Sequence, residues 1–172
     1  MIHWPFLLGI SMRIGVVSDT HNNLSNCRQI VQLFNEAAVD CVIHTGDITQ
    51  AKTIDVFSRL DMPMVGVFGN NDQERDTLEP AIARAGFQFF EPPYSLMLAG
   101  RSICIVHDPL EFPSDHEATF DISLHGHTHR FHQEQSACHL AFNPGECAGM
   151  MKGFNAIGIV DLLALKAEVL KF

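Results

Sequence analysis

The fold is decided by the stretch from Arg13 to His21, which reads RIGVVSDTH. An apolar, β-branched run is followed at once by a hydroxyl, a carboxylate and an imidazole. Such a run indicates a buried strand. Polar side chains that follow a strand of an open α/β sheet lie at the edge where such folds carry their sites. Asp19 and His21 are two positions apart, so an extended backbone would present both side chains on one face.

The same arrangement recurs along the chain. Strand-like runs at 41–45, 64–68 and 103–106 lead into Gly46-Asp47, Gly69-Asn70-Asn71-Asp72 and Val106-His107, and a later cluster reads Gly126-His127-Thr128-His129. Histidine is the commonest side-chain metal ligand, and carboxylates often share a site with it. The clusters therefore predict a metal centre whose ligands are Asp19, His21, Asp47, Asn70, His107, His127 and His129.

The first half of the chain alternates strand and helix patterns. Apolar residues at helical spacing predict helices over 24–38, 51–60 and 74–85, the last ending at Gly86. This alternation implies a parallel sheet with right-handed crossovers. The second half predicts short strands at 87–90, 95–99, 101–106, 122–125, 132–135, 138–142, 154–161 and 164–170. We therefore expect an α/β fold with a mixed sheet facing a second sheet.

One domain is expected over residues 12–172, without repeats or linkers. Residues 1–11 are predicted to be an apolar N-terminal extension, which an upstream start codon, a non-native leader or an arm on a neighbouring subunit would explain. The segment carries no basic region, and Pro5 and Gly9 interrupt it. It is therefore not expected to be a signal peptide or a membrane span. A homo-oligomer is compatible with this arm.

Charge and cysteine content restrict the partners. Twenty acidic and eleven basic residues give a net charge of −9. This argues against a nucleic-acid backbone or an anionic membrane as the main partner, because binding those surfaces requires clustered Lys and Arg. The five cysteines are odd in number and lack Cys-x-x-Cys spacing. Cys41 and Cys104 lie in strand runs, which favours buried free thiols and a cytoplasmic location.

The order and spacing of the clusters resemble the calcineurin-like metallophosphoesterases, especially their small single-domain bacterial and archaeal phosphodiesterases. The resemblance covers nearly all of 12–172 and includes Asn143-Pro144-Gly145. It implies a four-layer αββα sandwich with two mixed β-sheets flanked by helices. It also implies two divalent ions, of which Mn²⁺ or Ni²⁺ is favoured, while Fe²⁺, Zn²⁺ or Co²⁺ would also suit the ligands.

By this resemblance the two ions share Asp47 as a bridging ligand. One ion takes Asp19, His21, Asp47 and His129, and the other takes Asp47, Asn70, His107 and His127. The implied reaction is hydrolysis of a P–O bond of a small phosphoester, most simply a diester, by a metal-bridging hydroxide. Phosphomonoester hydrolysis is one alternative. A non-catalytic scaffold like the eukaryotic retromer subunit is another, although retention of all the ligands favours an enzyme.

One departure from the family pattern concerns catalysis. Many members carry histidine where this chain has Asn71, which can donate a hydrogen bond but cannot deliver a proton. We expect catalytic roles for Asp47, Asn70, Asn71 and Asp72. The Asp72 carboxylate lacks its usual partner in the family, the histidine that Asn71 replaces. Asp108 is a second departure. The remaining histidines are predicted to be core or supporting groups (His44, His125) or surface residues (His3, His116, His132, His139).

Overall fold

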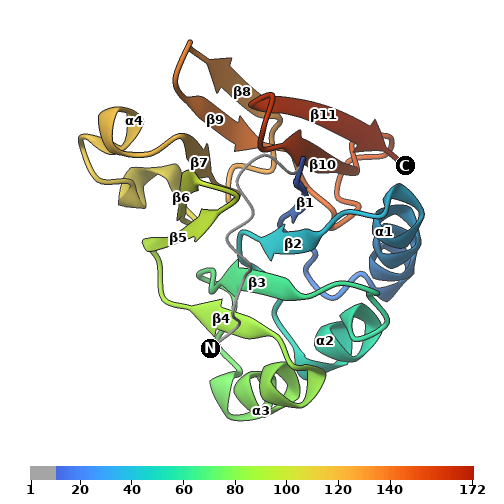
Figure 1. Ribbon diagram of the computed structural model, residues 1–172. Coiled ribbons are helices and arrows are strands. Elements are labelled where there is room, and N and C mark those ends of the chain that lie inside the picture. Colours follow the sequence, from blue (N-terminus) through green and yellow to red (C-terminus); the bar gives the residue numbers. More distant parts are fainter. Residues whose placement is uncertain (1–10) are drawn as a thin grey trace.

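The computed structural model describes residues 11–172, and two facing sheets organise them (Figure 1). The first sheet has six strands in the order β11-β10-β1-β2-β3-β4. Its middle strands are parallel, whereas β10 pairs antiparallel with both β1 and β11. The strands are β1 (Arg13–Val17), β2 (Cys41–His44), β3 (Met64–Val67), β4 (Gln88–Phe90), β10 (Ala156–Asp161) and β11 (Lys166–Lys171).

The second sheet has five strands in the order β5-β6-β7-β9-β8 and is also mixed. The β6-β7 and β7-β9 pairs are parallel, and antiparallel strands close both edges. The strands are β5 (Tyr94–Leu98), β6 (Arg101–Ile105), β7 (Ile122–Leu124), β8 (His132–Gln135) and β9 (Leu140–Asn143). The carboxyl ends of β6 and β7 therefore lie at one edge of this sheet, as those of β1, β2 and β3 do in the first.

Two apolar cores separate the layers. The outer core packs α1 (Leu24–Ala37), α2 (Ala51–Phe57) and α3 (Arg75–Ala85) against the first sheet. The inner core lies between the sheets, where Ile43 of β2 and Val67 of β3 meet Ile105 and Leu124. Along β2 and β3 successive side chains alternate between these cores, as the two-residue period of a strand requires.

Among residues 11–172, the helical segments beside the second sheet are short, namely the 3₁₀ turn η1 (Pro109–Glu111) and α4 (His116–Thr119), which packs against β7. Figure 1 shows α1, α2 and α3 together on one side and α4 at the opposite end. The predicted αββα arrangement with two mixed sheets is confirmed. Its helical layer beside the second sheet consists of the short segments η1 and α4.

Most predicted boundaries agree with the structure within one or two residues. The second helix ends at Phe57 rather than residue 60, because the following hydrogen bonds span three residues instead of four, from Arg59 N to Val56 O and from Leu60 N to Phe57 O. Gly86 ends α3 in the left-handed conformation with φ 73°, as expected. Cys41 and Cys104 are buried free thiols, and burial raises their thiol pKa values to about 12 and about 11.

One surface assignment was wrong. His139 is buried at 6% exposure, because its Nδ1 lies 2.7 Å from Phe120 O and its ring packs 5.9 Å from that of His116. His44 and His125 are buried, as predicted. The predicted extension 1–11 and His3 lie outside the described residues, apart from Ser11.

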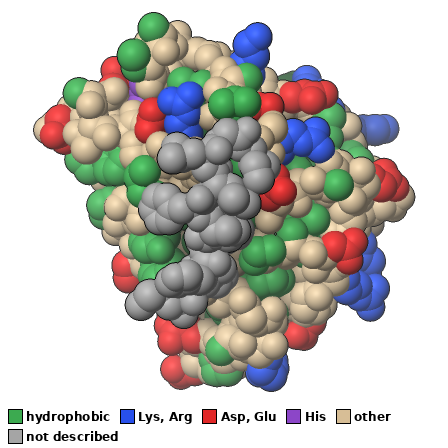
Figure 2. Space-filling model, viewed as in Figure 1, with side chains coloured by type: hydrophobic (Ala, Val, Ile, Leu, Met, Phe, Trp, Pro, Cys, Tyr) green, Lys and Arg blue, Asp and Glu red, His purple; other side chains and the backbone are tan. Residues whose placement is uncertain are grey.

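Two further expectations can be compared with the structure. Within 11–172, no helix combines the length and apolarity needed to cross a bilayer. On the face in Figure 2, Lys and Arg side chains are scattered among acidic ones and form no continuous basic surface.

Candidate metal centre

Ligand-bearing residues adopt unusual backbone conformations. Five of the seven predicted ligands have positive φ: Asp19 52°, His21 40°, Asp47 59°, His127 63° and His129 56°. Each such residue costs about 1–3 kcal/mol and persists only when its surroundings hold it. Here cross-strand hydrogen bonds do so, from Asp19 N to Gly46 O and from His21 N to Asp47 O, both 3.1 Å long. Strain of this kind concentrates at functional sites.

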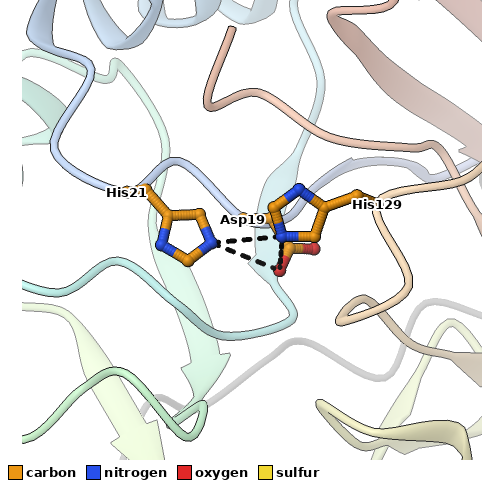
Figure 3. A group of neighbouring side chains, drawn as sticks. All are labelled: Asp19, His21 and His129. Carbon is orange, nitrogen blue, oxygen red and sulfur yellow. Dashed lines mark hydrogen bonds and ion pairs between the residues drawn. The ribbon is translucent and has the colours of Figure 1, made fainter. Parts of the chain in front are cut away.

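Asp19, at the end of β1, is fully buried between two ligand loops. Its Oδ2 accepts hydrogen bonds from Ser18 Oγ at 2.5 Å and from His127 N at 3.0 Å. Its Oδ1 has no hydrogen-bond partner. Figure 3 shows the rings of His21 and His129 turned toward this carboxylate, with Oδ1 3.8 Å and 3.4 Å from their Nε2 atoms.

Asp47, at the end of β2, lies between the two groups of predicted ligands. Its Oδ2 is 3.4 Å from His21 Nε2 on one side and 3.4 Å from His107 Nε2 on the other. Asp47 with Asp19 and His107 forms one cluster close enough to hold an ion, and Asp19 with His21 and His129 forms another. Asp19 is common to both clusters, and Asp47 Oδ2 faces one imidazole nitrogen of each group of predicted ligands.

Three predicted ligands meet on the far side of Asp47. Asn70 Oδ1 lies 3.0 Å from His107 Nε2 and 3.1 Å from His127 Nδ1, and the two nitrogens are 3.3 Å apart. The rings of the two histidines are nearly perpendicular, at 77°. All seven predicted ligands are thus brought together, although they come from both sheets.

A bound cation explains these contacts better than hydrogen bonds between the side chains do. The Asp19 Oδ1 atom is buried without a donor, and the Nε2 atoms of His21 and His129 approach each other at 3.2 Å. A buried carboxylate oxygen without a partner is costly unless a positive charge faces it. Two or more lone pairs directed at one point are what a divalent ion accepts. The residues present therefore fit divalent metal ions.

Neighbouring groups orient the histidines. His107 Nδ1 lies 2.9 Å from Thr45 O, so this nitrogen donates its hydrogen and Nε2 is the ring atom that faces Asp47. Asp108 Oδ2 lies 3.7 Å from His127 Nε2, which leaves Nδ1 directed at the centre. Asp108, singled out as a departure from the family pattern, also caps η1 through Leu110 N.

Electrostatics differ between the two buried carboxylates: burial raises the pKa of Asp19, whereas the pKa of Asp47 is lowered. Burial opposes ionisation of Asp47, but hydrogen bonds from His107 and Asn71 outweigh it and hold the pKa of the carboxyl below its usual range. Burial also opposes protonation of His107, yet Asp47 raises its pKa to about 9. A proton must therefore leave His107 before an ion can bind. Burial lowers the pKa of His44 to about 3, so that ring stays neutral.

Two residues have roles that the sequence did not reveal. Asn71 donates to both oxygens of Asp47, through its N–H at 2.9 Å and its Nδ2 at 2.7 Å. Asp72 is buried and accepts hydrogen bonds from the N–H groups of Asp47, Thr49 and Gly69 at 2.6–3.0 Å. Asp72 thus holds the backbone of two ligand loops, and Asn71 positions the Asp47 carboxylate.

A third supporting residue comes from the second sheet. Asn143 is fully buried at the end of β9, and its Nδ2 donates to Gly126 O at 3.1 Å and lies 3.2 Å from Thr128 Oγ1. Its Oδ1 accepts from Gly145 N. The Asn-Pro-Gly motif could therefore have predicted a residue that holds the loop with His127. Nothing in the sequence predicted that Ser18 would donate a hydrogen bond to Asp19.

Close packing explains two glycines in the clusters. Gly46 has φ 102°, and a Cβ there would lie 2.6 Å from His107 Nδ1. At Gly126 a Cβ would collide with Ser18 Oγ and lie 2.8 Å from Asp19 Oδ2. Only glycine lets these loops approach so closely.

Comparison with known proteins agrees with this geometry. A family model described as the calcineurin-like phosphoesterase superfamily domain matches residues 12–164. The chain belongs to this superfamily. Together with a 32% identical relative named a phosphodiesterase, this membership identifies the chain as a phosphoric ester hydrolase, and the Asp and His clusters are consistent with divalent metal binding.

Individual relatives are similar along most of their length. A protein named Phosphodiesterase MJ0936, from Methanocaldococcus jannaschii, is 32% identical over 162 residues, covering 87% of this chain and 93% of the relative. A solved structure described as a novel archaeal phosphodiesterase is 30% identical, with a TM-score of 0.86 over 94% of this chain and 100% of that one. The phosphoesterase Yfce from E. coli shares the fold at 19% identity, with a TM-score of 0.68 over 92% and 98% of the two chains.

Proposed function

We propose that this chain hydrolyses small phosphodiesters at a centre of two divalent ions. The observation that carries the proposal is the position of Asp47 Oδ2, 3.4 Å from an imidazole nitrogen in each half of the ligand set. A carboxylate so placed can serve two ions at once, with Asp19, His21 and His129 completing one set and Asn70, His107 and His127 the other.

Ions at such a site supply positive charge to the phosphoryl oxygens and lower the pKa of water, so that a nucleophile forms near neutral pH. Asn71 holds the bridging carboxylate, and Asp72 fixes the loops that carry Asp47 and Asn70. The Asn70 and His127 side chains are exposed, so a phosphoryl group can approach from their side. Mixed carboxylate, amide and imidazole ligands suit Mn²⁺ or Ni²⁺.

The name of one relative supports the preference for diesters, and Asn71 bears on which leaving groups can depart. The relative that is 32% identical is named a phosphodiesterase. Asn71 cannot protonate a departing oxygen, so the reaction must depend on leaving groups that depart without a proton. We expect activated aryl diesters to react much faster than unactivated alkyl esters.

A metal and substrate screen tests the proposal. The protein is purified without chelator, reconstituted separately with Mn²⁺ and Ni²⁺, and assayed with p-nitrophenyl esters, both monoester and diester. We expect about two ions per chain by elemental analysis and faster turnover of the diester. One ion or fewer per chain would contradict the dinuclear centre, and faster monoester turnover would contradict the substrate class.

A further inference from the structure

A cavity of about 450 Å³ lies directly beside the candidate metal centre. His129 forms part of its wall, and the same side chain brings Nε2 within 3.4 Å of Asp19 Oδ1. We call this cavity the phenylalanine pocket. The residues of its wall that matter here are Arg130, Phe131, Met151, Phe154, Val169 and Lys171.

Sheet topology explains why the pocket adjoins the centre. Strand β10 runs antiparallel to β1, with Gly158 opposite Val16, so the start of β10 lies at the end of β1 where Asp19 follows. Lys171, at the end of β11, pairs with Ala156 at the start of β10. The pocket and the metal centre therefore share one edge of the first sheet.

The pocket is lined by apolar side chains that face solvent. Phe131 and Phe154 are each 57% exposed, and Met151 is 44% exposed. Single exposed apolar residues are ordinary on a protein surface. Two aromatic rings and a thioether around one concave volume, next to convergent polar groups, are the usual composition of a small-molecule site.

The wall of the pocket is anchored to the metal loops. Glu146 is fully buried and accepts hydrogen bonds from Gly149 N at 2.9 Å and from Met151 N at 3.1 Å. The next residue, Cys147, donates its N–H to Asp19 O at 3.3 Å. The loop that carries Met151 is thus fixed relative to a predicted ligand, as a substrate-binding wall must be.

The charge at the pocket suits an anion with an aromatic part. Arg130 and Lys171 contribute two cationic side chains to the wall of a chain whose net charge is −9. The Lys171 Nζ lies 6.0 Å from the centroid of the Phe154 ring. These charges can attract a phosphoester, while the rings between them offer faces for stacking.

We propose that the phenylalanine pocket binds an aromatic substituent of the phosphodiester while the phosphoryl group lies at the metal centre. This inference rests on the proposed function and names its substrate class. A diester retains a second organic group that a monoester lacks, and the pocket gives that group a site. A methyl substituent is too small to contact both Phe131 and Phe154.

Binding of two non-hydrolysable phosphonates tests the pocket without turnover. Phenylphosphonate and methylphosphonate share the phosphoryl group and differ only in the ring. By calorimetry with the Mn²⁺-loaded protein, we expect phenylphosphonate to bind about tenfold more tightly, as burial of most of one ring would give. Phe131→Ala and Phe154→Ala should each reduce this preference several-fold. Leu163→Ala, which truncates an exposed side chain in the turn between β10 and β11, should retain it.

Methionine methyl NMR locates the ring. Phenylphosphonate should shift the Met151 methyl signal and leave that of Met97, exposed on β5, unchanged. Equal affinity for both phosphonates would contradict the pocket inference, and so would a preference that survives both phenylalanine substitutions. Neither result would contradict the proposed metal centre. Failure of the proposed function has a different signature. In that case neither phosphonate would bind, although phenol alone would still shift Met151. If phenol also left Met151 unchanged, the pocket inference would fail as well.

Discussion

The two sheets contribute different kinds of ligand to the centre. The first sheet supplies His21, Asn70 and both carboxylates, Asp19 and Asp47, which are buried and accept at least two hydrogen bonds each. The second sheet supplies only histidines, and the His127 side chain is 41% exposed. The carboxylates are thus preorganised by hydrogen bonds, whereas the exposed His127 ring is oriented by Asp108, whose Oδ2 lies 3.7 Å from its Nε2. Ligand changes in the two halves should therefore have unequal effects.

The largest effect is expected for Asp47→Ala. Loss of the shared carboxylate disturbs both ions. Mutation of a residue that only hydrogen-bonds to a metal ligand lowers activity by at most ~100-fold, so turnover of Asp47→Ala should fall by more than this. Steady-state rates at saturating Mn²⁺ measure this, with exposed Asp55→Ala as the matched control. Wild-type turnover in Asp47→Ala would remove Asp47 as the bridge.

Asp72→Ala tests the preorganisation itself. It removes the acceptor of three backbone N–H groups without touching a ligand, so Mn²⁺ affinity should fall about 10–100-fold. The free energy of unfolding should also fall by about 1–3 kcal/mol. Metal titration and urea unfolding measure the two effects, again beside Asp55→Ala. If the Mn²⁺ affinity of Asp72→Ala were unchanged, the hydrogen bonds that hold the first-sheet loops would not contribute to metal binding.

His127→Ala addresses the exposed half. This ring belongs to one ligand group only, so about one ion per chain should remain after reconstitution, and the decrease in turnover should be smaller than for Asp47→Ala. Elemental analysis gives the stoichiometry. A variant that lost both ions would show that the second sheet is as essential as the first, and the contrast between the halves would be wrong.

The smallest effect is expected at Asn71, which is exposed. Asn71→Ala removes one part-buried hydrogen bond to Asp47 and should reduce turnover about tenfold, the lower end of the about 1.5–3 kcal/mol that a hydrogen bond to a charged group contributes. Asn71→His removes the same bond but adds a proton donor, so it should flatten the dependence of rate on leaving-group pKa. Rates over a series of aryl and alkyl diesters compare the two variants. An identical dependence in both would show that the imidazole delivers no proton here.

The sequence by itself predicted the candidate ligands and determined most of the helices and strands. Apolar runs ending in Asp19, Asp47 and Asn70 indicate parallel strands, because a two-residue period and a polar terminus are local properties. The carboxyl ends of parallel strands meet at one edge, so the meeting of these residues followed from topology alone. Helix ends depended on caps, and so Gly86 was predictable whereas the end of α2 at Phe57 was not.

Only the tertiary structure decided what supports those ligands. Asp72 looked like a catalytic acid without a partner, but folding brings it to the N–H groups of Asp47 and Thr49, more than twenty residues away in sequence. The pocket beside His129 likewise needs Phe131, which precedes β8 of the second sheet, and Phe154, which precedes β10 of the first, to line one cavity. Periodicity cannot predict such contacts, because hydrogen bonds and packing between distant segments exist only after the sheets have closed on each other.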